Sequence, residues 1–372
     1  MTNISNFFNE IEESTYDFLE TLRHEDNKFC FYPAKEGLTK GGKELKLGFS
    51  CFGLKVYYIL GYWDNLSTED KEGWGSYIND FQKIKKMYPK NSYIDEALVS
   101  NYLKLNPKRL HKDLAKIILN NLNIKNYSSK NENILTSIRA ETKQAISTLK
   151  QVDMDQRFRY YEFPNNNKLL ENFFFLLDWN KPWDAGAQYA GLCVFASQAN
   201  ENQETIEYLK NFSRKIVQSK DGAYYLGETP RNSELVNGAM KVITGLDWID
   251  EPIHYPEKLI DLCLTIKPDH DGCDLVDIVY VLYKCLDQTE YKKSEIIKYF
   301  EEVKDIIKKH YFTKTGGFSY FLNRSQTHYY GVKITNGLKK PDLHGTTLLV
   351  WALSMIRDVI EPELNEWKII KP

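Results

Sequence analysis

The chain has 372 residues, of which 42% are hydrophobic and 14% are aromatic, including 7 Trp, 25 Tyr and 19 Phe. This content of large apolar side chains excludes intrinsic disorder and fibrous repeats, and the length is compatible with one large domain. The formal net charge of −2 does not provide the excess of positive charge that is typical of proteins that bind nucleic acid or an anionic membrane.

The N-terminal residues MTNISNFFNEIEESTYDFLETL lack a basic segment followed by a continuous apolar stretch. No window of 18 uncharged apolar residues is found, so we expect a cytoplasmic protein without a transmembrane segment. The six cysteines lack the spacing of a disulfide framework and are expected to be reduced thiols.

Helical periodicity recurs along the whole chain, and it separates two populations of helices. The first is amphipathic: between 292 and 309, Ile296, Phe300, Val303 and Ile307 fall on one stripe opposite Lys and Glu. Other ranges with this pattern are 6–22, 73–87, 92–104, 109–121, 168–178, 203–218 and 256–266. We expect these helices to have one solvated face.

The second population is apolar on nearly all faces, which is typical of buried helices. Its members are 49–61, 185–197, 237–248, 273–286 and 343–356, with the more polar 139–152 as a sixth. Because the two populations alternate, the sequence predicts an all-α fold of six inner helices paired with outer ones. Ranges 122–138 and 153–167 are expected to be long loops.

The preferred architecture is an α/α toroid, a closed ring of helix pairs, with an open solenoid as the alternative. Glycine turns at Gly222, Gly272 and Gly317, spaced 50 and 45 residues apart, support a helix-pair repeat. No range reads as an interdomain linker. We therefore expect one domain over residues 1–372, with residues 1–48 as a helical and loop lead-in.

Parallel inner helices place their N-termini at one end of the ring, where free N–H groups favour an anion or a thiolate. The polar residues predicted to gather there, called the rim, are Ser50, Arg139, Glu141, Trp183, Asp184, Asn237, Lys241, Asp271, Cys273, Asp274, Asp342 and His344.

Asp271, Cys273 and His344 combine three types of zinc ligand, and three protein ligands with one open position are typical of catalytic zinc. The segments DGCDLVDIVYVL, KTGGFSYF and DLHGTTLLVWAL resemble the corresponding segments of protein prenyltransferase β-subunits, which are α/α toroids. This resemblance covers about residues 180–357 and implies a zinc ion bound by Asp271, Cys273 and His344.

The resemblance extends to the related squalene and hopene-type terpenoid cyclases, but several of the features of both families are missing. The acidic DxDD motif of the cyclases has only DMDQ at 153–156 as its nearest match. The diphosphate-binding cluster of the prenyltransferases has no clear counterpart, with Arg231, Lys241, Arg324 and Lys333 as the candidates. The resemblance therefore supports the toroid fold better than it supports prenyl chemistry.

Each of these residues also has a structural interpretation. Cys273 can pack as a small apolar side chain, and Asp271 can serve a turn. His344 can cap its helix or satisfy a buried carbonyl. Asp184 can be an N-cap, which would still allow it to face the ring interior.

Three functions remain open. The first is an enzyme with a toroidal, aromatic-lined cavity, of the prenyltransferase or terpenoid cyclase-like type, acting on an extended apolar or lipid-like small molecule with a charged head. Zinc is a possible cofactor of this enzyme. The substrate-lining residues we expect are Trp183, Asn237, Lys241, Tyr329 and Lys333.

The second function is a glycan-active hydrolase, lyase or epimerase, which needs paired carboxylates and aromatic platforms. The catalytic candidates across both enzyme hypotheses are Glu141, Asp184, Asp342 and Tyr330, and Asp271 would be a further acid for glycan chemistry. The third function is a non-catalytic binding protein, because a fold alone implies no activity. Convergence of the rim residues would distinguish an enzyme from a binding protein.

Overall fold

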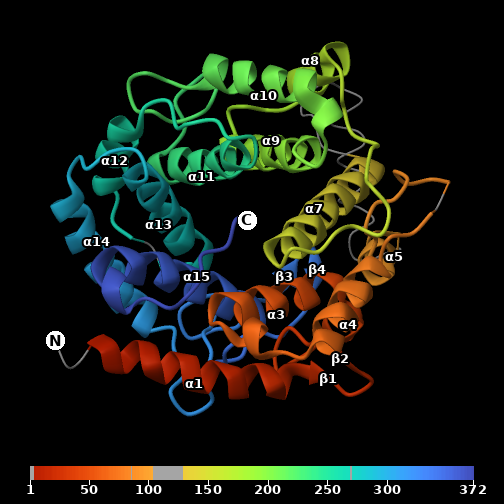
Figure 1. The fold of residues 1–372 in the computed structure, drawn as a ribbon, viewed down its shortest axis with the longest axis vertical. Coiled ribbons are helices and arrows are strands. Elements are labelled where there is room, and N and C mark those ends of the chain that lie inside the picture. The colour runs from red at the N-terminus through yellow and green to blue at the C-terminus, as the bar shows by residue number, and fades with distance from the viewer. Residues whose placement is uncertain (1–3, 85, 104–128, 269) are drawn as a thin grey trace, which may run out of the picture.

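Six helices form an inner ring in the computed structural model, which describes residues 4–84, 86–103, 129–268 and 270–372. They are α3 (Leu47–Ile59), α7 (Lys130–Gln151), α9 (Pro182–Ala196), α11 (Asn232–Trp248), α13 (Gly272–Leu286) and α15 (Leu343–Ile360). Each contacts the next in this order, and α15 returns to contact α3 (Figure 1). The ring is therefore closed, which confirms the α/α toroid and excludes the open solenoid.

The outer layer consists of the amphipathic helices, and each covers one or two helices of the ring. They are α1 (Ile4–Leu22), α4 (Thr68–Asn79), α5 (Glu96–Leu103), α8 (Asn167–Phe175), α10 (Gln203–Ile216), α12 (Pro256–Leu264) and α14 (Lys293–Lys308). In α14 the predicted stripe is buried at Ile296, Phe300, Val303 and Ile307. The alternation of inner and outer helices is thus confirmed.

Two predicted outer segments differ from the structure. Range 73–87 is only partly helical, because α4 begins after the N-cap Ser67 and ends at Asn79. The predicted helix at 109–121 lies outside the described residues.

The predicted loop at 122–138 is wrong over its described part, because α7 already begins at Lys130. The Ser129 hydroxyl accepts from the backbone N–H of Glu132, whose carboxylate accepts from the N–H of Ser129, so a capping box starts the helix. Arg139 and Glu141 consequently lie in the middle of α7 rather than at its N-terminus.

Two aromatic residues of the inner helices fill space between the two layers. Tyr57 of α3 donates to Glu20 of α1, and Tyr189 of α9 donates to the carbonyl of Leu209 in α10. Both rings are completely buried. The expected aromatic wall of the cavity is therefore corrected for these residues: they pack the core between the layers.

The remaining elements are short. They are α2 (Lys40–Glu44), the strands β1 (Arg23–His24), β2 (Asn27–Phe31), β3 (His328–Tyr329) and β4 (Val332–Lys333), and the 3-10 helices η1 (Tyr62–Asn65), η2 (Asn200–Asn202) and η3 (Pro362–Leu364). The strands form two antiparallel hairpins, β1 with β2 and β3 with β4. The second hairpin projects Tyr329 onto Phe49 and Phe52 of α3.

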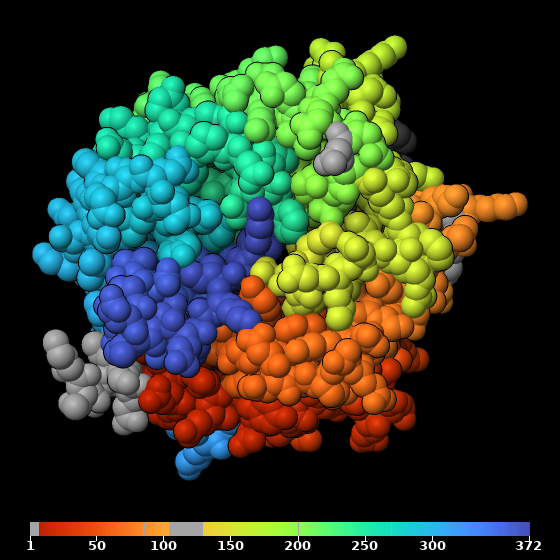
Figure 2. Space-filling model, in the orientation of Figure 1, coloured from red at the N-terminus to blue at the C-terminus, as the bar shows by residue number. Residues whose placement is uncertain are grey.

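The C-terminal tail, residues 365–372, crosses the end of the ring where the inner helices terminate. The N–H of Lys368 donates to the carbonyl of Ile59 in α3, and that of Lys371 donates to the Gln151 side chain in α7. Trp248 of α11 donates to the carbonyl of Pro372. The tail thus ties three inner helices together, and Figures 1 and 2 show its last residues in the middle of this face.

By length and composition α15 is the one helix of the described chain that could cross a membrane, but 72% of it is buried in the ring. Its apolar character follows from its place between α3 and α13. All six cysteines are free thiols, and Cys273 is the one that is not fully buried.

Candidate functional site

The candidate site lies where α13 and α15 begin. Asp271 is the N-cap of α13, and its carboxylate accepts from the N–H of Cys273 at 3.0 Å. Asp342 is the N-cap of α15. The segment around Tyr320 joins the two helix starts, because the N–H of Gly272 donates to the carbonyl of Tyr320 and the N–H of Tyr320 donates to Asp342.

Cys273 and Tyr320 are in direct contact. The Tyr320 hydroxyl donates to the thiol sulfur at 2.8 Å, although the residues are 47 positions apart. Burial, followed by the charge of Asp277, raises the pKa of Cys273 to about 12. Cys273 is therefore a neutral thiol in this arrangement rather than a thiolate activated by the helix N-terminus.

His344 lies beside this pair. Its ring stacks on Phe52 with 4.3 Å between centroids and lies 5.3 Å from the Tyr320 ring. Nδ1 is 3.1 Å from Oε1 of Gln326, which fixes Nδ1 as the donor and leaves Nε2 with the lone pair. Burial, followed by the charges of Lys241 and Lys55, lowers the pKa of His344 to about 3, so the imidazole is neutral. We call Cys273, Tyr320, Gln326 and His344 the Cys273 cluster.

Glu141 and Tyr329 form a second buried pair next to His344. The Tyr329 hydroxyl donates to Glu141 Oε1 at 2.6 Å, and the Tyr329 ring is 6.3 Å from that of His344. Burial, followed by the charge of Asp95, raises the pKa of Glu141 to about 8. Tyr329 thus connects the middle of α7 to the Cys273 cluster.

Asp277 and Lys241 extend the polar groups to α11. The ammonium of Lys241 lies 3.7 Å from Asp277 Oδ1, while Oδ2 of this buried carboxylate has no hydrogen-bond partner. Burial raises the pKa of Asp277 to about 6, and Lys241 opposes the shift. Polar side chains from α7, α11, α13, α15 and the Tyr320 segment therefore converge on the ring interior.

The three sequence-predicted zinc ligands each have another partner in this arrangement. The sulfur of Cys273 accepts a hydrogen bond from the Tyr320 hydroxyl, Asp271 caps α13, and His344 bonds to Gln326. Across the described ranges no group of three or more His, Cys, Asp or Glu side chains is placed to share a metal ion. Zinc remains a prediction from the sequence.

Several rim candidates serve the fold instead. The carboxylate of Asp342 accepts from the N–H groups of Gly345, Tyr320 and Gln326, so it is fully used as a cap. The Ser50 hydroxyl donates to the carbonyl of Phe29, outside the ring interior.

Arg139 also lies apart from the Cys273 cluster, because it bonds to Gln188 and faces the Phe173 ring.

Trp183 and Asp184 occupy the exposed first turn of α9. Lys181, rather than Asp184, is the N-cap, so the expected cap role of Asp184 is wrong. The backbone N–H of Trp183 donates to the carboxylate of Glu234 in α11, and the ammonium of Lys241 lies 5.9 Å from the Trp183 ring. This turn is thus linked to the Asp277 and Lys241 pair.

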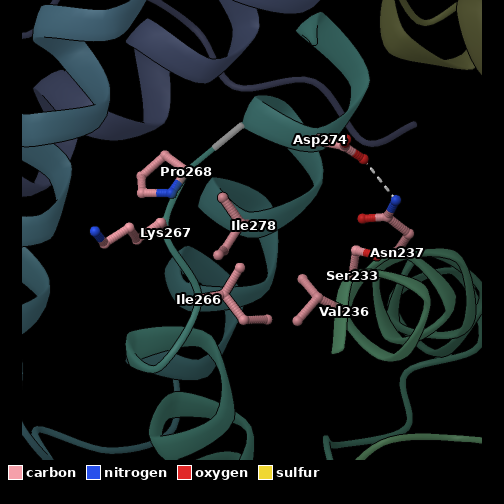
Figure 3. A pocket seen from close by; sticks show the side chains of 8 residues that line it. All are labelled: Ser233, Val236, Asn237, Ile266, Lys267, Pro268, Asp274 and Ile278. Carbon is pink, nitrogen blue, oxygen red and sulfur yellow. Dashed lines mark hydrogen bonds between the residues drawn. The ribbon is translucent and has the colours of Figure 1, made fainter. Parts of the chain in front are cut away.

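Asn237 bonds to Asp274 at 2.7 Å and lines a pocket of about 90 Å³ between α11, α13 and residues 266–268 (Figure 3).

Lys333 is exposed on β4 and bonds to Asn336, away from the Cys273 cluster. Tyr330 is half-exposed at the turn of the second hairpin, with φ of 42°, and its ring makes an edge contact with Tyr329. Arg324 lies over the Phe321 ring, and Arg231 is the exposed N-cap residue of α11.

Several residues of the site were not singled out from the sequence, among them Tyr320, Gln326, Asp277 and Lys55. Lys55 is the single charge in the otherwise apolar helix α3. A charged side chain in such a helix must face a polar interior, because burial in an apolar core would cost several kcal/mol. This signal is present in the sequence and would have identified Lys55, whereas Asp277 shares α13 with Asp274 and Lys284.

Comparison with known proteins supports the fold. No family model matches the chain, and no curated protein matches it. Among solved structures, Candida albicans protein geranylgeranyltransferase-I in complex with GGPP matches 94% of this chain and 91% of its own, with 11% identity and a TM-score of 0.51. A polysaccharide lyase matches 86% of this chain and 90% of its own, also at 11% identity, with a TM-score of 0.45. The chain has the α/α toroid fold.

Proposed function

We propose that this protein is an enzyme of the prenyltransferase or terpenoid cyclase-like type, acting on a small organic substrate held inside the ring. The observation that supports this best is the Cys273 cluster, which brings a thiol, a phenol and a neutral imidazole together from three distant segments. Catalytic groups must come within reach of one reacting atom, and a dispersed rim would have favoured a binding protein.

In this proposal His344 presents the lone pair of Nε2 to the substrate as a hydrogen-bond acceptor and weak base, since Nδ1 is held by Gln326 and burial lowers the pKa of the imidazole to about 3. The Tyr320 hydroxyl, 2.8 Å from the Cys273 sulfur, is the proton donor. Phe52 and Tyr329 keep the imidazole in place from the α3 side and the hairpin side.

The glycan-active alternative is less well supported because the carboxylates it needs are not paired. Asp342 is occupied by three backbone N–H groups, and Glu141 is buried under the hydroxyl of Tyr329. Asp184 lies in the exposed first turn of α9. A pair of carboxyl groups flanking one sugar linkage is not formed by these three residues.

The proposal is tested by turnover with a panel of allylic diphosphates, polyprenyl alcohols and uronic acid oligosaccharides, analysed by mass spectrometry. We expect conversion of an isoprenoid member, with losses of about 100-fold or more in His344→Gln and Tyr320→Phe. Lys298→Gln, on the exposed face of α14, is the control and should keep full activity. Full turnover by both site variants would overturn the proposal.

A further inference from the structure

Three lysines on three different helices of the ring lie close enough for their charges to act on one another. They are Lys55 of α3, Lys143 of α7 and Lys241 of α11, here called the three-lysine group. The charges of Lys55 and Lys241 both act on Lys143 and both act on His344 of α15. Because α7 and α9 separate α3 from α11 in the ring, this is possible only if the charges meet inside it.

The group lacks sufficient negative charge around it. Within the described chain, Lys55 and Lys143 have no hydrogen bond or ion pair. Lys55 is nevertheless only 7% exposed. Lys241 faces Asp277 at 3.7 Å. Among the described residues, Asp277 is thus the carboxylate at ion-pair distance from the group, and burial raises the pKa of Glu141, two residues from Lys143 on α7, to about 8.

An unpaired lysine inside a protein is costly, so an arrangement of this kind needs a compensating function. Burial and the charges of Lys55 and Lys241 lower the pKa of Lys143 well below its ordinary value. Burial also lowers the pKa of Lys55 to about 8. An anion placed among the three would reverse these shifts by favouring the charged forms.

The ring also leaves room beside these side chains. Ala187 is exposed although it belongs to an inner helix, and one turn further along α9 a Cβ at Gly191 would meet only Phe195, at 3.9 Å. These small residues lie on the helix between those carrying Lys143 and Lys241. The neighbouring carboxylate oxygen Asp277 Oδ2 is buried without a partner.

We propose that the three-lysine group binds a compact oxyanion, namely a phosphate, sulfate or carboxylate group, inside the ring. Only one statement, that this oxyanion is the head group of the substrate, rests on the proposed function. The bound anion would lie on the α11 side of His344, so that the remainder of the substrate reaches the Cys273 cluster. Of the four basic residues that the sequence offered as candidates for a diphosphate-binding cluster, only Lys241 belongs to this site.

The test is isothermal titration calorimetry of the full chain with inorganic phosphate, pyrophosphate, sulfate and glucuronate as separate probes. We expect one anion per chain, bound about 10- to 100-fold more weakly by Lys143→Gln and unchanged in the control Lys298→Gln. Asp277→Asn should bind more tightly than the wild type, because it removes the carboxylate that competes for Lys241. The opposite signs of the two variants separate charge recognition from a loss of folding.

Proton uptake provides an independent readout. Titrations at pH 7.5 in two buffers of different ionisation enthalpy should show uptake of up to about one proton per anion, because the anion favours protonated Lys143 and Lys55. The other titratable groups whose charges act in this region are Glu141, Lys241, Asp274, Asp277, His344 and the thiols of Cys51, Cys193 and Cys273. The uptake should fall in Lys143→Gln.

Two results would overturn the inference: equal affinity of the wild type and Lys143→Gln for every probe, or no binding of any probe at about 10 mM. The proposed function is tested independently of anion binding. His344→Gln and Tyr320→Phe should lose turnover but retain anion binding. If binding depends on Lys143 and no reaction is detected, the anion site stands and the proposed function fails.

Discussion

The hydroxyl of Tyr320 lies 2.8 Å from the sulfur of Cys273, and this contact links the start of α13 to a turn 47 residues away. The same turn donates its backbone N–H to Asp342 at the start of α15. The phenol therefore holds the two helix starts together and places a proton donor between the thiol and the imidazole of His344. Its position explains why polar residues of separate segments share one site.

Cys273 should be the first of the six thiols to react with iodoacetamide in the native protein, because the other five are buried. The reaction should be slow at neutral pH, since burial raises the pKa of this thiol to about 12. Peptide mapping by mass spectrometry checks the site, with urea-denatured protein as the control in which all six react. Faster labelling of any other cysteine would contradict the described burial.

Lys143→Gln should stabilise the protein while weakening anion binding. The substitution removes a charged group that has no partner in the described chain, so we expect the free energy of unfolding to rise by about 1 kcal/mol. Urea denaturation without phosphate measures this change. Lys298→Gln should stay within about 0.5 kcal/mol of the wild type. A destabilised Lys143→Gln would mean that the lysine supports the fold instead.

Two buried carboxyl groups, Asp277 and Glu141, should each make a contribution to stability that is lost as pH rises, because they bind protons more tightly in the folded state. Burial raises the pKa of Asp277 from 3.8 to about 6 and that of Glu141 from 4.5 to about 8. Between the unfolded and folded pKa values the native state binds more protons, so this contribution to the free energy of unfolding falls with pH, while the lowered pKa values of His344 and Lys143 act in the opposite direction.

The two variants should separate these contributions. Relative to the wild type, Asp277→Asn should remove a loss of stability of up to about 3 kcal/mol that develops below about pH 6, and Glu141→Gln should remove one that extends to about pH 8. Urea midpoints at several pH values give the comparison. Slopes identical to that of the wild type in both variants would show that these carboxyl groups are not protonated in the folded state.

Asp342→Ala should destabilise the protein by about 2 to 4 kcal/mol, because three backbone N–H groups lose their acceptor. Asp342→Asn, which keeps one acceptor oxygen, should cost less. Chemical denaturation measures both. A catalytic carboxylate would give the reverse pattern, with activity lost in the Asn variant at nearly full stability.

Metal analysis decides the zinc prediction. With the Cys273 sulfur engaged by Tyr320 and Asp271 engaged as a cap, we expect purified protein to contain less than about a tenth of an equivalent of zinc. Added zinc should not shift the melting temperature. Stoichiometric zinc that is lost in both Cys273→Ala and His344→Ala would instead establish the predicted ligand set.

The two layers of the fold were predictable from the pattern of apolar residues. Helices that are apolar on all faces had to be buried, and their alternation with amphipathic helices predicted the inner and outer rings. In α3, all residues except Tyr58 are buried, as the sequence 49–61 indicated. Cysteine, aspartate and histidine at the starts of α13 and α15 were visible as candidates from their positions alone.

The roles of those candidates follow from contacts between segments that are distant in the sequence. A side chain at a helix start can cap the helix or face the ring interior, and the choice depends on which distant N–H group or hydroxyl arrives beside it. Asp342 is taken by the backbone of Tyr320 and Gln326, while the hydroxyl of Tyr320 goes to Cys273. Lys55, Lys143 and Lys241 are far apart in the sequence, and only the closed ring brings their charges together.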